Sequence, residues 1–469
     1  MHPRITALAA PTLAALSLFG VASSAQAAPH GHHHVAMPHG HHHEAMPPSV
    51  GATDPGIQAV PLQLPAASYN VRNQSQLLAA LRAAQPGQVV HLASGAVFSD
   101  LWDLRARSGW VTVSGAGDAV EPIIEGANLE GSQYLRFTNV EFTQRVLIAR
   151  SPTRGSSQPA SNVQILNSDV NCGSTQTNPK TTGIVVRQAS QNVTIAGDWI
   201  HNCTLGFDTV AQDNPTTGLT IEHNLFQNFY GDAIDLGGLD NTAIVDNVIE
   251  DIRHSAGVVY HDDGIQFLGN TSNTLIQNNV LANSGDQLLF IQAAIAGQFN
   301  GVQTNSNIVV DRNLIYGAGA AAVQDQGAVN LHFVDNTVWD SNNAALIIRR
   351  GTQGTTGATT TLQGNILQSY IQMSAPGSES HNLILSVSRQ TQNTLSPTDI
   401  VGIAPSFVNA GQGDFALVPG TTGSGTTSDS PTVTTSSSGV PSGSSSNAGM
   451  LLGADPANFP YGAPVYGVS

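Results

Sequence analysis

Four aspartates in the middle of the chain stand at spacings that could build a site for acid–base chemistry or for a metal ion. Asp208 and Asp235 each directly follow an apolar residue, and Asp232 and Asp263 open the segments Asp-Ala-Ile-Asp and Asp-Gly-Ile-Gln. On neighbouring strands such carboxylates would face each other at about 4.8 Å, where one takes up a proton or the group binds a cation. We therefore expect paired acids, or a Ca²⁺ ion held by Asp208, Asp232, Asp235 and Asp263.

Titratable side chains gather in the segment just before Asp263, although only 10% of the chain is charged. Histidine, tyrosine and arginine beside carboxylates can exchange protons with a substrate. The expected catalytic residues are His261, Asp263, Asp235, Tyr260 and Arg253. The expected substrate contacts are Gln266, Gly264, His254, Arg187, Gln324 and Arg349. A simpler interpretation stays open for Asp232 and Asp263, which could be turn residues that bond their own backbone.

These residues must be positioned by a repeated element, because one phrase recurs along the chain: an apolar residue, two spacers, Asn, one spacer and another apolar residue. It is centred on Asn224, Asn247, Asn279, Asn313, Asn336 and Asn365, at steps of 23, 32, 34, 23 and 29 residues. Such spacing indicates a solenoid with loops of variable length, and the short alternating β-branched segments indicate strands. We expect about nine coils from Leu135 to Leu367, with the Asn amides stacked inside as structural groups.

The strand that follows each Asn can be aligned by its first inward apolar residue. The inward residues are then Ile184, Phe207, Ile234, Ile265, Leu288, Val323 and Leu346. Because strand side chains alternate, the next residues face outward: Val185, Asp208, Asp235, Gln266, Leu289, Gln324 and Ile347. Two places before the inward residue lies a second row, made of Thr182, Leu205, Asp232, Asp263, Asp286, Ala321 and Ala344. The small residues between the two rows, such as Gly264, are expected to let a ligand approach the backbone.

The coil pattern, the opening segment 71–92 and the closing segment Ala404-Pro-Ser-Phe-Val-Asn resemble the secreted right-handed parallel β-helix proteins. That superfamily contains pectate and alginate lyases, mannuronan epimerases, polygalacturonase-type hydrolases and phage tailspikes. The resemblance covers residues 67–418 and implies an all-β fold, a right-handed parallel β-helix of about nine or more coils. A short amphipathic segment around Gln76 to Ala84 is expected to form a helix that caps the N-terminal end.

The segment from His261 to Gln266 resembles a His-x-Asp-Gly-Ile-Gln phrase of secreted β-helix proteins. The resemblance implies that His261, Asp263 and Gln266 belong to the site, with Gly264 as the position of close approach.

Three functions remain open on these residues. A polysaccharide lyase or epimerase would use His261 as the base, Tyr260 or Arg253 as the acid, and Ca²⁺ to neutralise a uronate. A hydrolase would use two of the aspartates without metal, although the chain lacks the Gly-His-Gly and Arg-Ile-Lys phrases of polygalacturonase-type enzymes. A surface protein that only binds a glycan or a metal is the third.

The net charge is −16, from 16 Lys and Arg against 32 Asp and Glu. This charge disfavours nucleic acid as a partner, and a polysaccharide is the partner that the resemblance implies.

Residues 1–27 resemble a secretory signal, with Arg4, an apolar run and Ala25-Gln-Ala27 as a cleavage site. Export to the periplasm or the medium is expected, without membrane insertion. In an oxidising compartment a disulfide between Cys172 and Cys203 is expected, since they occupy similar places on consecutive coils.

The remaining segments differ in composition from the coils. Residues 28–66 form a His-rich arm and linker, 419–448 a Ser/Thr/Gly-rich linker and 449–469 a C-terminal tail. Repeated imidazoles chelate borderline divalent ions such as Zn, Cu or Ni. The expected ligands are His32, His33, His34, His41, His42 and His43.

Overall fold

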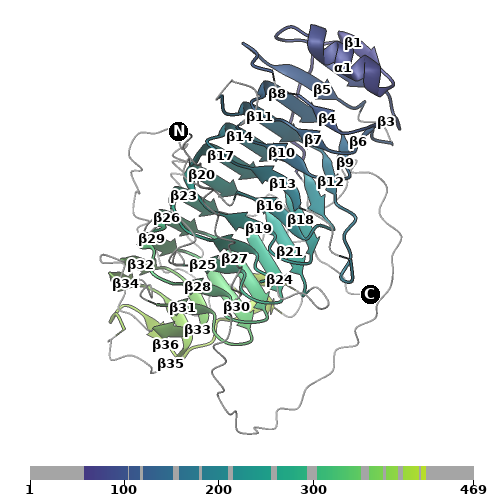
Figure 1. The fold of residues 1–469 in the computed structure, drawn as a ribbon. Coiled ribbons are helices and arrows are strands. Elements are labelled where there is room, and N and C mark those ends of the chain that lie inside the picture. Colours follow the sequence, from purple (N-terminus) through teal and green to yellow (C-terminus); the bar gives the residue numbers. More distant parts are fainter. Residues whose placement is uncertain are drawn as a thin grey trace, which may run out of the picture. The chain divides into compact units, whose positions relative to one another are not determined.

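The computed structural model describes most of the central part of the chain (Figure 1). The described residues are 58–103, 105–116, 120–150, 158–178, 182–209, 215–254, 261–292, 304–349, 359–372, 377–388, 395–410 and 413–418. The six arm histidines and Tyr260 lie outside these ranges, as do the expected signal segment, the second linker and the tail.

The strands stack in three parallel rows, and each complete coil contributes one strand to each row. The first row is β1 (Tyr69–Val71), β2 (Val89–Leu92), β5 (Val111–Ser114), β8 (Gln133–Thr138), β11 (Ser161–Leu166), β14 (Gln191–Ala196), β17 (Thr216–Glu222), β20 (Leu239–Val245), β23 (Thr271–Gln277), β26 (Ser306–Asp311), β29 (Val329–Val334), β32 (Thr360–Gln363) and β34 (Ser378–Ser380).

The second row follows a short turn. It is β3 (Val97–Phe98), β6 (Ile123–Ile124), β9 (Glu141–Phe142), β12 (Asp169–Asn171), β15 (Trp199–His201), β18 (Leu225–Phe229), β21 (Val248–Ile252), β24 (Val280–Ser284), β27 (Leu314–Ala318), β30 (Thr337–Ser341), β33 (Ile366–Gln372), β35 (Leu383–Ser388) and β36 (Ile400–Val401).

The third row carries the candidate site. It is β4 (Leu101–Trp102), β7 (Ala127–Asn128), β10 (Val146–Ile148), β13 (Thr182–Val186), β16 (Leu205–Asp208), β19 (Ile234–Leu236), β22 (Ile265–Phe267), β25 (Leu289–Ile291), β28 (Val323–Asp325) and β31 (Leu346–Ile348). Strands β33 and β35 continue both the second and the third row. A short antiparallel hairpin, β37 (Phe407–Asn409) and β38 (Asp414–Leu417), follows.

Between Leu135 and Leu367 the described part of the first row holds nine strands, β8 to β32, so the predicted number of coils is confirmed. Inward side chains of successive coils lie in register, as in the pairs Ile221 with Ile244 and Ile244 with Ile276. These apolar side chains form one continuous buried core. The predicted parallel β-helix is therefore confirmed.

The cap is helix α1 (Gln74–Ala83), which begins two residues before the predicted start. Asn73 explains the difference, because its side-chain oxygen accepts a hydrogen bond from the backbone of Gln76 at 3.1 Å and so forms an N-cap. Leu77 and Leu81 are buried against the first coil. No helix in the described ranges is long and apolar enough to cross a membrane.

The repeated Asn residues form a buried ladder at the turn between the first and second rows. Asn279 Oδ1 accepts hydrogen bonds from the backbone and the side-chain amide of Asn247, both at 2.9 Å, and Asn279 Nδ2 donates to Asn313 Oδ1 at 3.0 Å. The same contacts recur from coil to coil. Each Asn side chain therefore forms hydrogen bonds with the buried polar groups of a turn, which would otherwise be unpaired. The ladder supports the fold and takes no part in the candidate site.

Two further contacts stabilise the stack, one between coils and one between a coil and the N-terminal segment. The structure joins Cys172 to Cys203 in a disulfide, the pairing expected from their places on consecutive coils. Asn167 holds the N-terminal segment. Its Oδ1 accepts a hydrogen bond from Val60 N at 2.6 Å, and its Nδ2 donates one to Val60 O at 3.0 Å.

Candidate functional site

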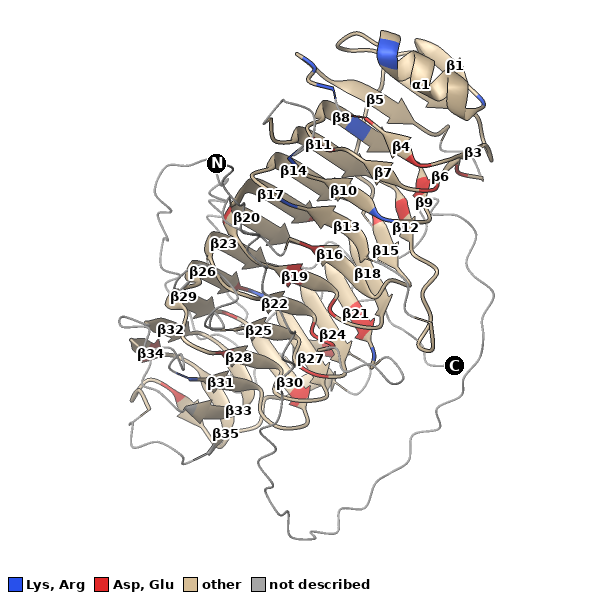
Figure 2. Ribbon diagram, in the orientation of Figure 1, with Lys and Arg blue, Asp and Glu red and all other residues tan. Residues whose placement is uncertain are grey.

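Polar residues stack on the outer side of the third row, over β16, β19 and β22. Asp208 lies in register with Asp235, and Asp235 with Gln266. Figure 2 shows the acidic residues on β16 and β19. The predicted row is correct over these three coils, because each strand alternates one inward apolar residue with one outward polar residue.

On the next coil the predicted alignment is wrong by one residue. Leu289, not Leu288, pairs with Ile265, so Phe290 takes the outward place that we expected for Leu289. The same shift places Gln287 beside Asp263, and Asp286 therefore does not belong to that row. Leu288, Leu289 and Phe290 are all apolar, so no polar residue marks the outward position.

Arg187 supplies the positive charge of the site. It directly follows β13, and its Nη2 lies 2.5 Å from Asp208 Oδ2 on the next coil. The Arg187 side chain is 41% exposed, whereas Asp208 is buried. The guanidinium therefore covers Asp208 and can still reach a ligand that lies along the row.

Asp235 is buried between Asp208 and Gln266, and its Oδ1 has no hydrogen-bond partner in the described part of the chain. The pKa of Asp235 is raised to about 7, first by burial and then by the negative charges of Asp208 and Asp263, while Arg187 and His261 oppose the rise. Asp235 is thus a carboxyl group that changes its charge near neutral pH and has a free oxygen.

Asp232 and Asp263 occupy the turn between the second and third rows. Asp232 Oδ1 accepts a hydrogen bond from Asp263 N at 2.9 Å, and Asp263 Oδ1 accepts one from Gln287 N at 2.9 Å. Both carboxylates accept a hydrogen bond from the following coil. Asp232 and Asp263 therefore have a structural role, but not the expected one of bonding the backbone of their own turns. Burial raises the pKa of both carboxyl groups.

His261 is the exposed titratable group of the site. Its Nδ1 lies 3.6 Å from Asp263 Oδ2, an ion-pair distance, and 54% of the side chain is exposed. The ring stacks on Phe290 with a 9° angle between the planes. Interaction with Asp263 raises the pKa of His261 above its ordinary value, against a smaller lowering from partial burial. With Nδ1 directed to Asp263, Nε2 is the nitrogen left for a substrate.

Gly264 does not offer space to a ligand. A Cβ atom there would lie 2.5 Å from the backbone oxygen of Leu288, and Gly183 and Gly206 are similarly close to the backbone of the following coil. These small residues let neighbouring turns pack together, which accounts for Gly264 without a ligand, and the substrate contact there stays a prediction.

The other predicted residues are placed as follows. Gln266 is buried and donates to Gln292 at 3.2 Å, and Gln324 occupies the outward row one coil beyond Phe290. Arg349 is exposed directly after β31. Arg253 turns to Asp251, at 3.4 Å, and no described contact brings it to the aspartates. His254 contacts Asp262 and not the row.

The four aspartates expected to hold Ca²⁺ fit that ion poorly. Arg187 engages Asp208, and backbone amides engage Asp232 and Asp263. In the described ranges the aspartates do not form a set whose oxygens all lie within 4.8 Å of one another. Ca²⁺ takes six to eight oxygen ligands, so these residues do not fit the expected calcium ion, and no step below depends on it.

Comparison with known proteins gives a family and several similar folds. Residues 122–281 and 217–367 match the model of the right handed beta helix region. No curated protein sequence matches the chain. Among solved structures, pectate lyase Pel9A is similar at 13% identity and a TM-score of 0.46, over 80% of this chain and 90% of that chain.

Two further solved structures are similar over 71% of this chain. The A-module of the Azotobacter vinelandii mannuronan C-5 epimerase AlgE6 has 15% identity, a TM-score of 0.43 and 98% of its own length covered. A mannuronic acid specific polysaccharide family 6 lyase from human gut microbiota has 11% identity, a TM-score of 0.44 and 84% covered. Because the family match spans residues 122 to 367, more than half of the chain, the protein belongs to the right-handed β-helix family.

Proposed function

We propose that the protein is a polysaccharide lyase or epimerase that acts on a uronate-containing glycan at the third row. The observation that carries the proposal is Asp235, a buried carboxyl with a free oxygen and a pKa raised to about 7, set beside the Arg187–Asp208 ion pair. The resemblance of the sequence supplies the substrate class. The outward residues of the third row lie in register on consecutive coils, and we propose that a chain of sugars lies along them.

Both reactions begin with removal of a proton from the carbon next to a uronate carboxylate. That proton becomes acidic only when the carboxylate is neutralised, because the negative charge that develops must be stabilised. The protonated form of Asp235 can donate a hydrogen bond to the carboxylate, and the Arg187 guanidinium can pair with it. These two groups make the substrate acidic without a metal ion.

His261 is the base in this proposal. Asp263 orients the ring from the Nδ1 side, so Nε2 accepts the proton from the sugar. In a lyase the electrons of the C–H bond form a double bond as the glycosidic C–O bond breaks, and the leaving oxygen takes up a proton. In an epimerase the carbon takes a proton back on its opposite face. Tyr260 and Arg253 remain the predicted acids.

A glycoside hydrolase is the second candidate, and one observation favours it. Asp208 and Asp235 are neighbours on adjacent strands in different surroundings, one beside a guanidinium and one buried with a raised pKa. Hydrolases use such a pair, in which the protonated carboxyl serves the leaving group and the ionised one activates water or attacks carbon.

Export belongs to the same proposal. The disulfide between Cys172 and Cys203 supports it, because disulfides persist in oxidising compartments outside the cytosol. A uronate polysaccharide would be met there.

His261→Ala tests the assignment of the base. We expect kcat to fall by about 100-fold or more, the usual contribution of a general base. The matched control is His332→Ala, a half-buried histidine on β29 of the first row that bonds Asn330, and it should keep full activity. Equal activity of both variants on the true substrate would show that His261 is not the base.

A further inference from the structure

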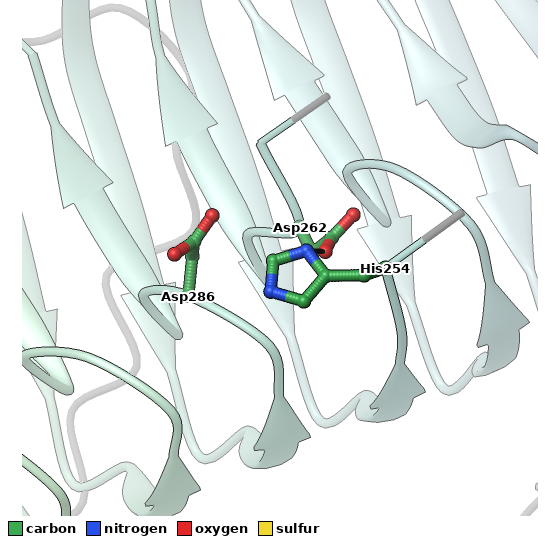
Figure 3. Close-up of side chains that lie close together, drawn as sticks. All are labelled: His254, Asp262 and Asp286. Carbon is green, nitrogen blue, oxygen red and sulfur yellow. Dashed lines mark ion pairs between the residues drawn. The ribbon is translucent and has the colours of Figure 1, made fainter. Parts of the chain in front are cut away.

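We propose that the turn beside the candidate site binds a divalent transition metal ion of the zinc type through His254, Asp262 and Asp286. The three residues come from the segments that lead into β22 and β25, on consecutive coils (Figure 3). One possible ligand atom from each lies within 4.8 Å of the other two. This set shares no residue with the aspartates expected to hold Ca²⁺, and the inference does not depend on the proposed catalytic activity.

Asp262 gives independent evidence of a missing partner. Its side chain is fully buried, its Oδ1 has no hydrogen-bond partner in the described ranges, and its Oδ2 contacts His254 Nδ1. A buried carboxylate oxygen without a donor is costly, and Asp286 adds a second negative charge close by. A divalent cation would satisfy the free oxygens and balance both charges.

The backbone leaves room for this group of side chains. Gly285 lies beside them, and a Cβ atom there would stand 2.9 Å from Asp262 Oδ2 and 3.3 Å from His254 Nε2. The backbone amide of Gly285 donates to Ile252 at 3.0 Å, which holds the turn against the preceding coil. Any larger residue at position 285 would press on both ligands, so the turn is shaped around them.

The donor set indicates which ion would bind. One imidazole nitrogen with two carboxylate oxygens suits Zn²⁺ and its neighbours in the first transition series. Ca²⁺ binds oxygen ligands almost exclusively, and it takes more ligands than this group of three residues offers. The His254 side chain is 63% exposed, so the ion would keep an open side toward solvent, where water or a sugar hydroxyl could complete its coordination.

The test is zinc binding by the full chain, measured by titration calorimetry and by metal content after dialysis. The His-rich arm must not contribute, so the background protein carries Gln in place of His30, His32, His33, His34, His39, His41, His42 and His43. In this background we expect one equivalent of Zn²⁺. Asp262→Asn and His254→Ala should each lower the affinity at least tenfold, whereas Asp251→Asn, on β21 and paired with Arg253, should leave it unchanged.

Two results would overturn the inference. One is unchanged zinc binding by both Asp262→Asn and His254→Ala, with unfolding curves that show folded proteins. The other is displacement of the bound zinc by an equal concentration of Ca²⁺, which would assign the site to a different class of ion. Neither result depends on lyase activity, so failure here and failure of the proposed function are distinguishable.

Discussion

Two aspartates at equivalent places on adjacent coils differ because of what surrounds them. Asp208 lies under the Arg187 guanidinium, while Asp235 is buried with an oxygen free. Burial is the largest cause of the raised pKa of Asp235, and the charge of Asp208 is the next. One residue type thus supplies a charged group and a proton donor within a single row.

Asp235→Asn should change the pH dependence in a way that separates the two candidate reactions. In the lyase or epimerase, kcat/KM should rise as His261 loses its proton and becomes a base, and should fall as the pH rises above about 7, because Asp235 then loses the proton that it donates to the substrate. An amide donates a hydrogen bond at every pH, so Asp235→Asn should retain activity and lose this alkaline fall. In a hydrolase the same change removes the acid.

Complete pH profiles of the native protein and the variant decide the matter. Loss of all activity in Asp235→Asn, together with an intact fold, would contradict the lyase assignment and favour the hydrolase.

The outward positions of Asp208, Asp235 and Gln266 could be predicted because each is the single polar residue after an inward apolar one. The position of Asp286 could not be predicted in this way. In that strand three apolar residues follow one another, so the period of two has no polar mark to fix its phase. The sequence alignment placed Asp286 beside Asp263, one residue out of register, and so it did not predict the cluster of His254, Asp262 and Asp286.

At the scale of the element, the Asn ladder shows how a polar repeat can hold an apolar column together. Its central members were evident from the repeated phrase. The ladder also continues to Asn382, whose amide donates to Asp399 at 3.1 Å. That end was not foreseen, because Glu379 stands where the phrase has an apolar residue, in register with Leu362.

Asn279→Ala should lower the free energy of unfolding by about 2–4 kcal/mol, since it leaves the buried backbone amide of Asn247 without its acceptor and the acceptors Ile244 O and Asn313 Oδ1 without the donor of Asn279. Denaturant titration measures the change. The control is Asn307→Gly, which removes an exposed amide at a left-handed position, φ 52°, that glycine also adopts. We expect about 0.5 kcal/mol for the control. Equal losses would mean that the ladder contributes no more than a surface amide.

At the scale of the whole molecule, stacking converts residues far apart in sequence into one surface. Arg187, Asp208, Asp235 and His261 come from successive coils, and each reaches the site only because the rows stay in register. The repeated Asn phrase was enough to predict the fold. The hydrogen-bond and ion-pair partners of each site residue depend on contacts between loops, which the repeat does not determine. Arg253 and His254 illustrate this, since both are paired elsewhere.

The most direct measurement of the central claim follows the ultraviolet absorbance of purified protein incubated with a panel of uronate polysaccharides, with Ca²⁺ and then with chelator. Proton magnetic resonance of the polymer reports epimerisation in the same samples. We predict an unsaturated or epimerised sugar from the native protein, persisting after chelation because Asp235 and Arg187 neutralise the uronate, and formed about 100-fold or more slowly by His261→Ala. A flat trace and unchanged polymers throughout, with no reducing ends released from neutral glycans, would contradict the account and indicate a protein that only binds its glycan.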